Sequence, residues 1–248
     1  MNLKTYDLVT VGSGPAALST AIEAKKRGFS VCMIDKESLL NTIKNYPTQA
    51  TFFSTSDLLS LHNIPMITTG KQPTRLEAMK YYSQLVQHFD VPTSLHNEVE
   101  AIERQEDYFY IKGSRESFRA KYVVVATGYF DKYNALNDQV EEKGNVTHYY
   151  DEAFSYLGLK VLVVGASNSA AEAALDLYRH GVDVRLIHRG EGLYKKLKYW
   201  LKPDLENRIA NDEIPAYFHS EIVDVRNGAA IVQQKEEELT LSCDRILA

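Results

Sequence analysis

The sequence contains only two cysteines and no Cys-x-x-Cys pair. Cys32 and Cys243 each lie in or beside an apolar run, so the sequence predicts neither a disulfide framework nor a zinc site, and we expect no bound metal. Cys32 falls inside an expected strand, where a small buried thiol is common. We therefore expect this thiol to belong to the core and to take no part in redox chemistry.

Long apolar runs and an excess of positive charge are also missing. No run approaches the roughly 20 apolar residues of a membrane span, and residues 1–7 lack the apolar core of a signal peptide. We therefore expect a cytoplasmic protein without a membrane contact. The formal net charge of −5 argues against a nucleic-acid partner, and 248 residues are enough for two modest domains.

The feature that organises the sequence is a glycine-rich turn between an apolar run, residues 8–11, and a helical pattern that ends near residue 28. Gly12 permits a tight turn, Gly14 lets the backbone approach a pyrophosphate, and Ala17 lets the helix lie close to the strand. The helix N-terminus then faces the phosphates. The residues expected at this dinucleotide site are Gly12, Gly14, Pro15, Ala16 and Ala17.

The next apolar run, residues 31–34, ends at Asp35 and Lys36. A carboxylate at the end of the second strand of such a unit accepts hydrogen bonds from ribose hydroxyls. Strand, turn, helix and acid together favour nucleotide binding over the alternative, which is a purely structural turn.

The same pattern recurs in the second half of the chain. An apolar run, residues 160–164, leads into the turn Gly165-Ala-Ser-Asn-Ser-Ala170, and the following helix ends near residue 181. The turn glycine, helix end and second strand end of the first half match those of the second half at one constant offset. The repeat predicts an α/β architecture of two Rossmann-like domains, residues 1–130 and 131–248, joined through an irregular polar segment, residues 130–158.

A comparison of the matching positions distinguishes the ligands expected in the two halves. Asp35 suits a free ribose hydroxyl and repels a 2′-phosphate, whereas His188 and Arg189 at the matching place favour NADPH; a solvated surface arginine is the alternative. Ser167 replaces the expected second glycine of this turn. This replacement lowers the affinity for NADPH that we expect. A lysine-rich segment, residues 191–203, is either a solvated face or a surface that attracts phosphates. The residues expected to contact NADPH are Gly165, Ser167, Asn168, Ser169, Ala170, His188 and Arg189.

Between the two turns, the sequence predicts a helix and a strand meander. Thr74 and Glu77 form a capping box at the start of the helix. The residues expected on its buried face are Leu76, Met79, Tyr82, Leu85, Val86 and Phe89. The runs that predict the meander are residues 99–102, 108–111 and 117–122. Residues 122–126 then predict a buried parallel strand.

Several motifs make the sequence similar to a known family. Besides the glycine turn, they are Asn45-Tyr-Pro-Thr48, Thr51-Phe-Phe-Ser-Thr-Ser-Asp57, Ile64-Pro65 and Lys71-Gln-Pro-Thr-Arg75. In these motifs the chain resembles the YpdA family of flavoproteins, which are regarded as NADPH-dependent bacillithiol-disulfide reductases with a thioredoxin-reductase-like fold.

The resemblance implies FAD in the first domain and NADPH in the second. A hydride passes from NADPH to FAD, and electrons then pass to an acceptor, a low-molecular-weight disulfide such as oxidised bacillithiol. Family members have a further C-terminal segment that returns to the first domain, so the resemblance implies a truncated chain that holds flavin weakly or not at all. By resemblance, and in addition to the first glycine turn, Asp35 and Lys36, the residues beside FAD are Asn45, Thr51, Phe52, Val99, Ala126, Thr127 and Gly128.

Position 16 departs from the family. Family members usually carry a cysteine where this chain has Ala16, so the catalytic residue is unknown and we expect slow disulfide turnover. Three functions remain open: a disulfide reductase, a flavin monooxygenase-like or NADPH-oxidase enzyme, and a redox sensor that binds FAD and NADPH without turnover. The sequence is also compatible with a homo-oligomer.

Overall fold

The computed structural model describes residues 3–130 and 132–248. The chain divides into two compact units, Met1–Lys132 and Tyr133–Ala248. Asp131, with which the expected second domain begins, lies outside the described residues. Of the described helices, none combines the length and apolar character that crossing a membrane requires.

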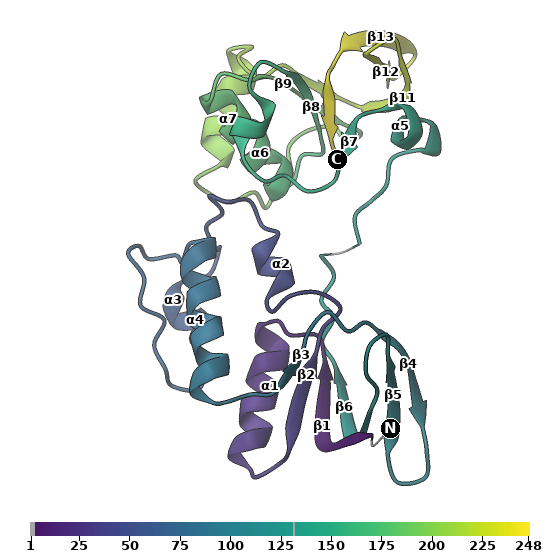
Figure 1. The fold of residues 1–248 in the computed structure, drawn as a ribbon. Helices are drawn as coiled ribbons and strands as arrows, with labels where there is room; N and C mark the ends of the chain where they lie inside the picture. Colours follow the sequence, from purple (N-terminus) through teal and green to yellow (C-terminus); the bar gives the residue numbers. More distant parts are fainter. Residues whose placement is uncertain (1–2, 131) are drawn as a thin grey trace. The chain divides into compact units, whose positions relative to one another are not determined.

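The first unit is built on one sheet (Figure 1). Its strands are β1 (Lys4–Val11), β2 (Val31–Ile34), β3 (Thr93–Ser94), β4 (Val99–Arg104), β5 (Phe109–Gly113) and β6 (Phe118–Val125). They form a six-stranded sheet in the order β3-β2-β1-β6-β5-β4. Strands β3, β2, β1 and β6 are parallel, and β5 and β4 continue the sheet as the predicted antiparallel meander.

Of the two longer helices, α1 packs on strands β1 and β2, and α4 packs on α1 and α2 (Figure 1). The helices of this unit are α1 (Pro15–Lys26), α2 (Asn41–Lys44), α3 (Ser56–Leu59) and α4 (Arg75–His88). In α4, Tyr82 and Leu85 are buried as predicted, but Leu76 is 53% exposed. The first turn of α4 is engaged by hydrogen bonds to the preceding loop, and the buried stripe begins one turn later, with Ala78 and Tyr81.

Glu77 joins the start of α4 to the loop before it. Its carboxylate accepts hydrogen bonds from the backbone N–H and the hydroxyl of both Thr69 and Thr74, at 2.7–2.9 Å. Thr74 Oγ1 in turn accepts from the Glu77 N–H at 3.2 Å, so the predicted capping box is confirmed. The hydrogen bonds, those from Thr69 foremost, lower the pKa of Glu77 to about 2.

β6 differs from the buried strand that the sequence predicts. The third strand of the meander and the expected parallel strand are one continuous strand, of which only Phe118 and Ala120 are buried. Tyr122 and Val125 are 57% and 65% exposed. β5 pairs only with residues 118–120, so the later part of β6 has β1 as its one neighbour in the described sheet. An unbroken apolar run is typical of a strand that is covered on both faces. β6 has such a run but is not covered on both faces.

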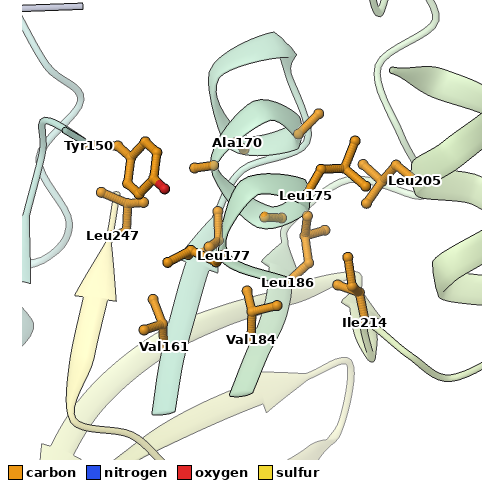
Figure 2. Close-up of a cluster of buried hydrophobic side chains, with 14 of the residues drawn as sticks. Tyr150, Val161, Ala170, Leu175, Leu177, Val184, Leu186, Leu205, Ile214 and Leu247 are labelled. Carbon is orange, nitrogen blue, oxygen red and sulfur yellow. The ribbon is translucent and has the colours of Figure 1, made fainter. Parts of the chain in front are cut away.

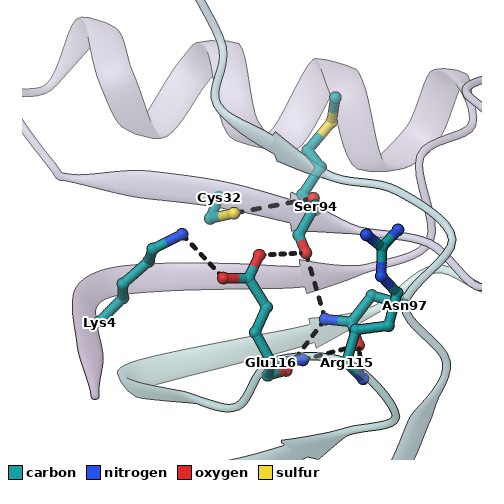
Figure 3. Close-up of polar contacts among 7 residues, drawn as sticks. Lys4, Cys32, Ser94, Asn97, Arg115 and Glu116 are labelled. Carbon is teal, nitrogen blue, oxygen red and sulfur yellow. Dashed lines mark hydrogen bonds and ion pairs between the residues drawn. The ribbon is translucent and has the colours of Figure 1, made fainter. Parts of the chain in front are cut away.

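A polar network holds the meander to the parallel strands (Figure 3). The buried carboxamide of Asn97 donates to Ser94 Oγ at 3.1 Å and to the Glu116 carbonyl at 3.0 Å. It accepts from the Arg115 N–H at 2.9 Å. The Glu116 carboxylate accepts from the Ser94 hydroxyl and from the Lys4 ammonium, each at 2.7 Å. Because the buried side chains of Ser94 and Asn97 have hydrogen-bond partners, the segment before β4 is fixed beside β3.

The second unit contains two sheets (Figure 1). Its strands are β7 (Val146–Thr147), β8 (Lys160–Val164), β9 (Asp183–His188), β10 (Ala216–Phe218), β11 (Ser220–Arg226), β12 (Ala229–Gln234), β13 (Glu237–Ser242) and β14 (Arg245–Leu247). A parallel sheet has the order β10-β9-β8-β14-β7, and β11, β12 and β13 form an antiparallel sheet. The helices are α5 (Asp138–Lys143), the 3-10 helix η1 (Ala153–Tyr156), α6 (Asn168–Arg179) and α7 (Lys202–Ala210).

The core of the second unit lies between α6 and the parallel sheet (Figure 2). Leu175 and Leu177 of α6 pack in one buried cluster with Val184 and Leu186 of β9. Strand, turn, helix and strand therefore follow the same course as in the first unit.

The segment from residue 130 to 158 is less irregular than the sequence predicts. α5 begins after Asn137, whose side chain accepts a hydrogen bond from the Val140 N–H at 3.1 Å. Val140 is fully buried and anchors the helix in the core of the second unit. A helix this short offers too few apolar positions to show a period in the sequence.

Glu77→Gln should lower the free energy of unfolding by roughly the 1 kcal/mol of a capping interaction. The pKa of this carboxyl is depressed in the folded state, so its stabilisation is complete above the unfolded value of 4.5 and is lost as the pH falls toward 2. The gap in melting temperature between wild type and Glu77→Gln, followed by circular dichroism, should therefore shrink in that range. Glu106→Gln, at an exposed glutamate, is the matched control. A gap that stays constant as the pH is lowered would contradict this role.

Candidate functional site

The first glycine turn lies where three parallel strands end. The Gly12 N–H donates to the Ile34 carbonyl at 2.7 Å, and the Ala126 N–H donates to the Val11 carbonyl at 2.8 Å. Gly12 has a φ of +113°, and a Cβ atom there would lie 2.3 Å from the Ala126 carbonyl oxygen. Only glycine fits this position, and the ends of β1, β2 and β6 meet at it.

The N-terminus of α1 opens at this turn. Gly14 is its N-cap, no side chain caps it, and its first turn carries no acidic residue. Open space extends for 4 Å around the place of a Cβ atom on Gly14. Ala16 is exposed, while Ala17 is fully buried and allows the close contact of helix and sheet that the sequence predicts. Free N–H groups, a positive helix end and open space fit a diphosphate.

Asp35 has protein partners that the sequence does not indicate. Its Oδ2 accepts hydrogen bonds from the Ser13 N–H at 2.8 Å and from the Ser13 hydroxyl at 2.7 Å. Its Oδ1 accepts from the Glu37 N–H at 3.0 Å. The carboxylate therefore ties the end of β2 to the glycine turn. Lys36, the next residue, is exposed.

The turn after β6 and an aromatic cluster lie at the edge of the sheet where β1, β2 and β6 end. Thr127 and Gly128 are exposed beyond Ala126. The Tyr46 ring lies 5.8 Å from the Phe52 ring and 5.3 Å from the Phe130 ring. Burial raises the pKa of the Tyr46 hydroxyl. The loop that the resemblance places beside the flavin thus contacts the end of the first unit that follows Gly128.

That loop is docked on the residues before α4. The Phe52 N–H donates to the Pro73 carbonyl at 2.9 Å, and Thr51 forms an isolated bridge with Thr74. Asn45 is exposed at the end of α2. The loop therefore rests on the segment that Glu77 holds in place, a connection that no motif in the sequence suggests.

Val99 lies near the same edge of the sheet. It begins β4, two residues after Asn97, whose N–H donates to the Asp35 carbonyl at 2.9 Å. The side chain of Val99 is half-buried, so any contact with an adenine would come from its backbone, as the resemblance implies.

The second glycine turn repeats the geometry of the first. Gly165 has a φ of +128°, and its N–H donates to the Ile187 carbonyl at 2.9 Å. α6 follows Ser167, has no side-chain cap and carries no acidic residue in its first turn. Ser167 and Ser169 are exposed, and Ala170 is buried at the helix–sheet contact. This turn also fits a diphosphate.

The end of β9 carries a different chemistry from the end of β2. Burial, and then the charge of Arg189, lower the pKa of His188, so its imidazole is neutral at pH 7. Gly190 lies so close to this ring that a Cβ atom would be 2.6 Å from Nε2. Arg189 is exposed and has no hydrogen-bond or ion-pair partner in the part of the chain that the structure describes. Its guanidinium is available to a phosphate.

The lysine-rich segment is not a uniform solvated face. The Lys198 ammonium pairs with Glu172, and its side chain is only 11% exposed. The Lys198 N–H donates to Asn168 Oδ1 at 2.8 Å, and the Tyr194 N–H donates to the Ala166 carbonyl at 3.0 Å. The segment is therefore tied to the second glycine turn.

Neither cysteine is placed for redox chemistry. Cys32 and Cys243 are 2% and 8% exposed. Burial raises the pKa of the Cys32 thiol to about 11 and raises that of Cys243. The prediction that Cys32 belongs to the core is confirmed. The residues described contain no cluster of histidine, cysteine or acidic side chains suited to a metal ion.

Comparison with known proteins agrees with this geometry. A family model described as pyridine nucleotide-disulphide oxidoreductase matches residues 9–248. Bacilliredoxin reductase Bdr of Bacillus subtilis (strain 168) is 31% identical over 242 residues, which cover 97% of this chain and 75% of that protein.

Two solved structures have the same fold over nearly the whole chain. They are the bacillithiol disulfide reductases Bdr (YpdA) from Staphylococcus aureus and Bacillus cereus, with identities of 29% and 32% and TM-scores of 0.95 for both. Each covers 99% of this chain, which spans 76% and 77% of theirs. The predicted two-domain α/β fold, the resemblance to the YpdA family and the prediction of an oxidoreductase with FAD and NADPH as cofactors are confirmed. The chain therefore belongs to the family of pyridine nucleotide-disulphide oxidoreductases.

Proposed function

We propose that this chain binds FAD in its first unit and NADPH in its second, and that it reduces a low-molecular-weight disulfide, bacillithiol disulfide. The observation that carries the proposal is the pair of open glycine turns whose second strands end differently. Asp35 follows the first, and His188 with Arg189 follows the second. The cytoplasm is the proposed compartment, because thiols are kept reduced there.

The proposed contacts follow from the two turns and the loops around them. For FAD they are Gly12, Gly14, Pro15, Ala16, Ala17, Asp35, Lys36, Asn45, Thr51, Phe52, Val99, Ala126, Thr127 and Gly128. For NADPH they are Gly165, Ser167, Asn168, Ser169, Ala170, His188 and Arg189. The uncapped N-termini of α1 and α6 stabilise the diphosphate charges.

When bound, FAD would supply the redox chemistry: it would take a hydride from NADPH and deliver its two electrons and one proton to the disulfide, and one further proton from solvent would complete two thiols. The chain contributes binding and orientation to this reaction. Its two cysteines are buried, and Ala16 supplies no thiol at the exposed first turn of α1. The disulfide must therefore meet the flavin directly, or a thiol of another molecule.

The charge of Arg189 should set the coenzyme preference. One charge-assisted contact to the 2′-phosphate contributes about 1.5–3 kcal/mol, so Arg189→Ala should weaken NADPH binding about ten- to a hundredfold and leave NADH binding nearly unchanged. Isothermal titration of both nucleotides measures this. Arg104→Ala, at an exposed arginine of the first unit, is the control. Equal wild-type affinities for NADPH and NADH would show that the second site is wrongly assigned.

Ala16 should limit turnover of the disulfide. A cysteine at this position would lie at the positive end of α1, where the thiol pKa is lowered and the thiolate is favoured. We expect rapid flavin reduction by NADPH, slow reduction of bacillithiol disulfide, and at least about tenfold faster disulfide reduction in Ala16→Cys. NADPH consumption with and without the disulfide measures both steps.

Ser19→Cys, one turn further into α1, is the matched control for a new thiol. A wild type that already reduces the disulfide as fast as it oxidises NADPH, with no gain in Ala16→Cys, would contradict this role of position 16. NADPH consumption that depends only on oxygen would instead favour an NADPH oxidase. Faster turnover with bacilliredoxin than with the small disulfide would replace the proposed acceptor.

A further inference from the structure

Ser13 and Asp35 form one unit at the first glycine turn. Ser13 is fully buried between the two glycines, and both its N–H and its hydroxyl donate to Asp35 Oδ2, at 2.8 and 2.7 Å. A buried hydroxyl needs a partner, and the carboxylate is the partner that it has. We propose that Ser13 is a positioning residue for the dinucleotide: it holds one oxygen of Asp35 so that the other meets a ribose hydroxyl.

The hydrogen bonds that the Asp35 carboxylate already accepts limit how many it can accept from a ligand. A carboxylate offers about four lone-pair sites. Two on Oδ2 are taken by Ser13, and one on Oδ1 is taken by the Glu37 N–H at 3.0 Å. One site remains, on Oδ1, and it accepts a single ribose hydroxyl. The carboxylate cannot rotate without breaking all three hydrogen bonds, so it is oriented before the ligand arrives.

The second glycine turn of the same chain can be compared with the first. Its glycine has a similar φ and the same hydrogen bond to the neighbouring strand, and its helix begins in the same uncapped way. At the place of Ser13 it has Ala166, which is 3% exposed and has no hydroxyl. At the place of Asp35 it has His188. Serine and acid are thus present together in one turn and absent together from the other.

The inference concerns how the proposed nucleotides are distinguished, and it rests on the proposed function. Where the acid is used, the serine orients it toward a ribose hydroxyl. Where a 2′-phosphate is to be accepted, both are absent and Arg189 takes the charge. At either turn, preference for a nucleotide with a free ribose hydroxyl should therefore require the pair.

A double-mutant cycle on the full chain tests the first turn. FAD affinity is measured by titrating flavin fluorescence for wild type, Ser13→Ala, Asp35→Ala and the double variant. We expect Ser13→Ala to weaken FAD binding about five- to tenfold, as for one hydrogen bond to a charged group. The double variant should bind FAD no more weakly than Asp35→Ala. Asp35→Asn replaces Asp35→Ala in the cycle if the latter fails to fold.

Two measurements separate positioning from a structural effect. FMN lacks the adenosine ribose, so its binding should be the same in wild type and Ser13→Ala. Ser155→Ala removes another hydroxyl that donates to a carboxylate, that of Asp151, and should leave FAD affinity unchanged. Additive losses in the cycle, equal losses for FAD and FMN, or no loss in Ser13→Ala would each overturn the proposal.

Transfer of the pair to the second turn is the complementary test. His188→Asp alone should lose NADPH binding and gain little NADH binding, whereas Ala166→Ser with His188→Asp should bind NADH about tenfold more tightly than His188→Asp. A serine that adds no NADH affinity in a folded double variant would overturn the proposal. A wild type that binds neither FAD nor NADPH would overturn the proposed function itself, whereas binding of both without coupling overturns only the role of Ser13.

Discussion

The contact between Gly12 and the Ala126 carbonyl is the constraint on which the first unit depends. A side chain at position 12 would collide with that oxygen, so glycine alone lets β1 turn between β2 and β6. The same turn releases the first N–H groups of α1 into open space and brings Ser13 within reach of Asp35. Packing, helix start and polar site thus follow from one close approach of two backbones.

The second unit uses the same backbone with different side chains. Its turn, helix and second strand follow the course of the first, but its strand ends in a neutral imidazole beside an exposed guanidinium. The two sites therefore differ in charge and not in architecture. Two such turns in one chain fit an oxidoreductase that uses FAD and a pyridine nucleotide, in agreement with the family to which the chain belongs.

The elements predicted best from the sequence were those set by local chemistry. The glycine turns and the capping box at Thr74 depend on a few neighbouring residues, and the structure has them. The half-exposed end of β6 was missed because its unbroken apolar run resembles a strand buried on both faces. The roles of Ser13 and Lys198 were missed because each depends on a partner 22 or more residues away. Long-range partners of this kind leave no local pattern.

The most direct test of the account is anaerobic titration of the FAD-loaded chain with NADPH and, separately, with NADH. The visible absorbance of the flavin reports electron transfer between the two nucleotides without any assumption about the final acceptor. The account predicts that NADPH bleaches the flavin and that NADH does so only at much higher concentration, because the 2′-phosphate meets Arg189. A flavin that neither nucleotide bleaches, or that both bleach equally, would contradict it.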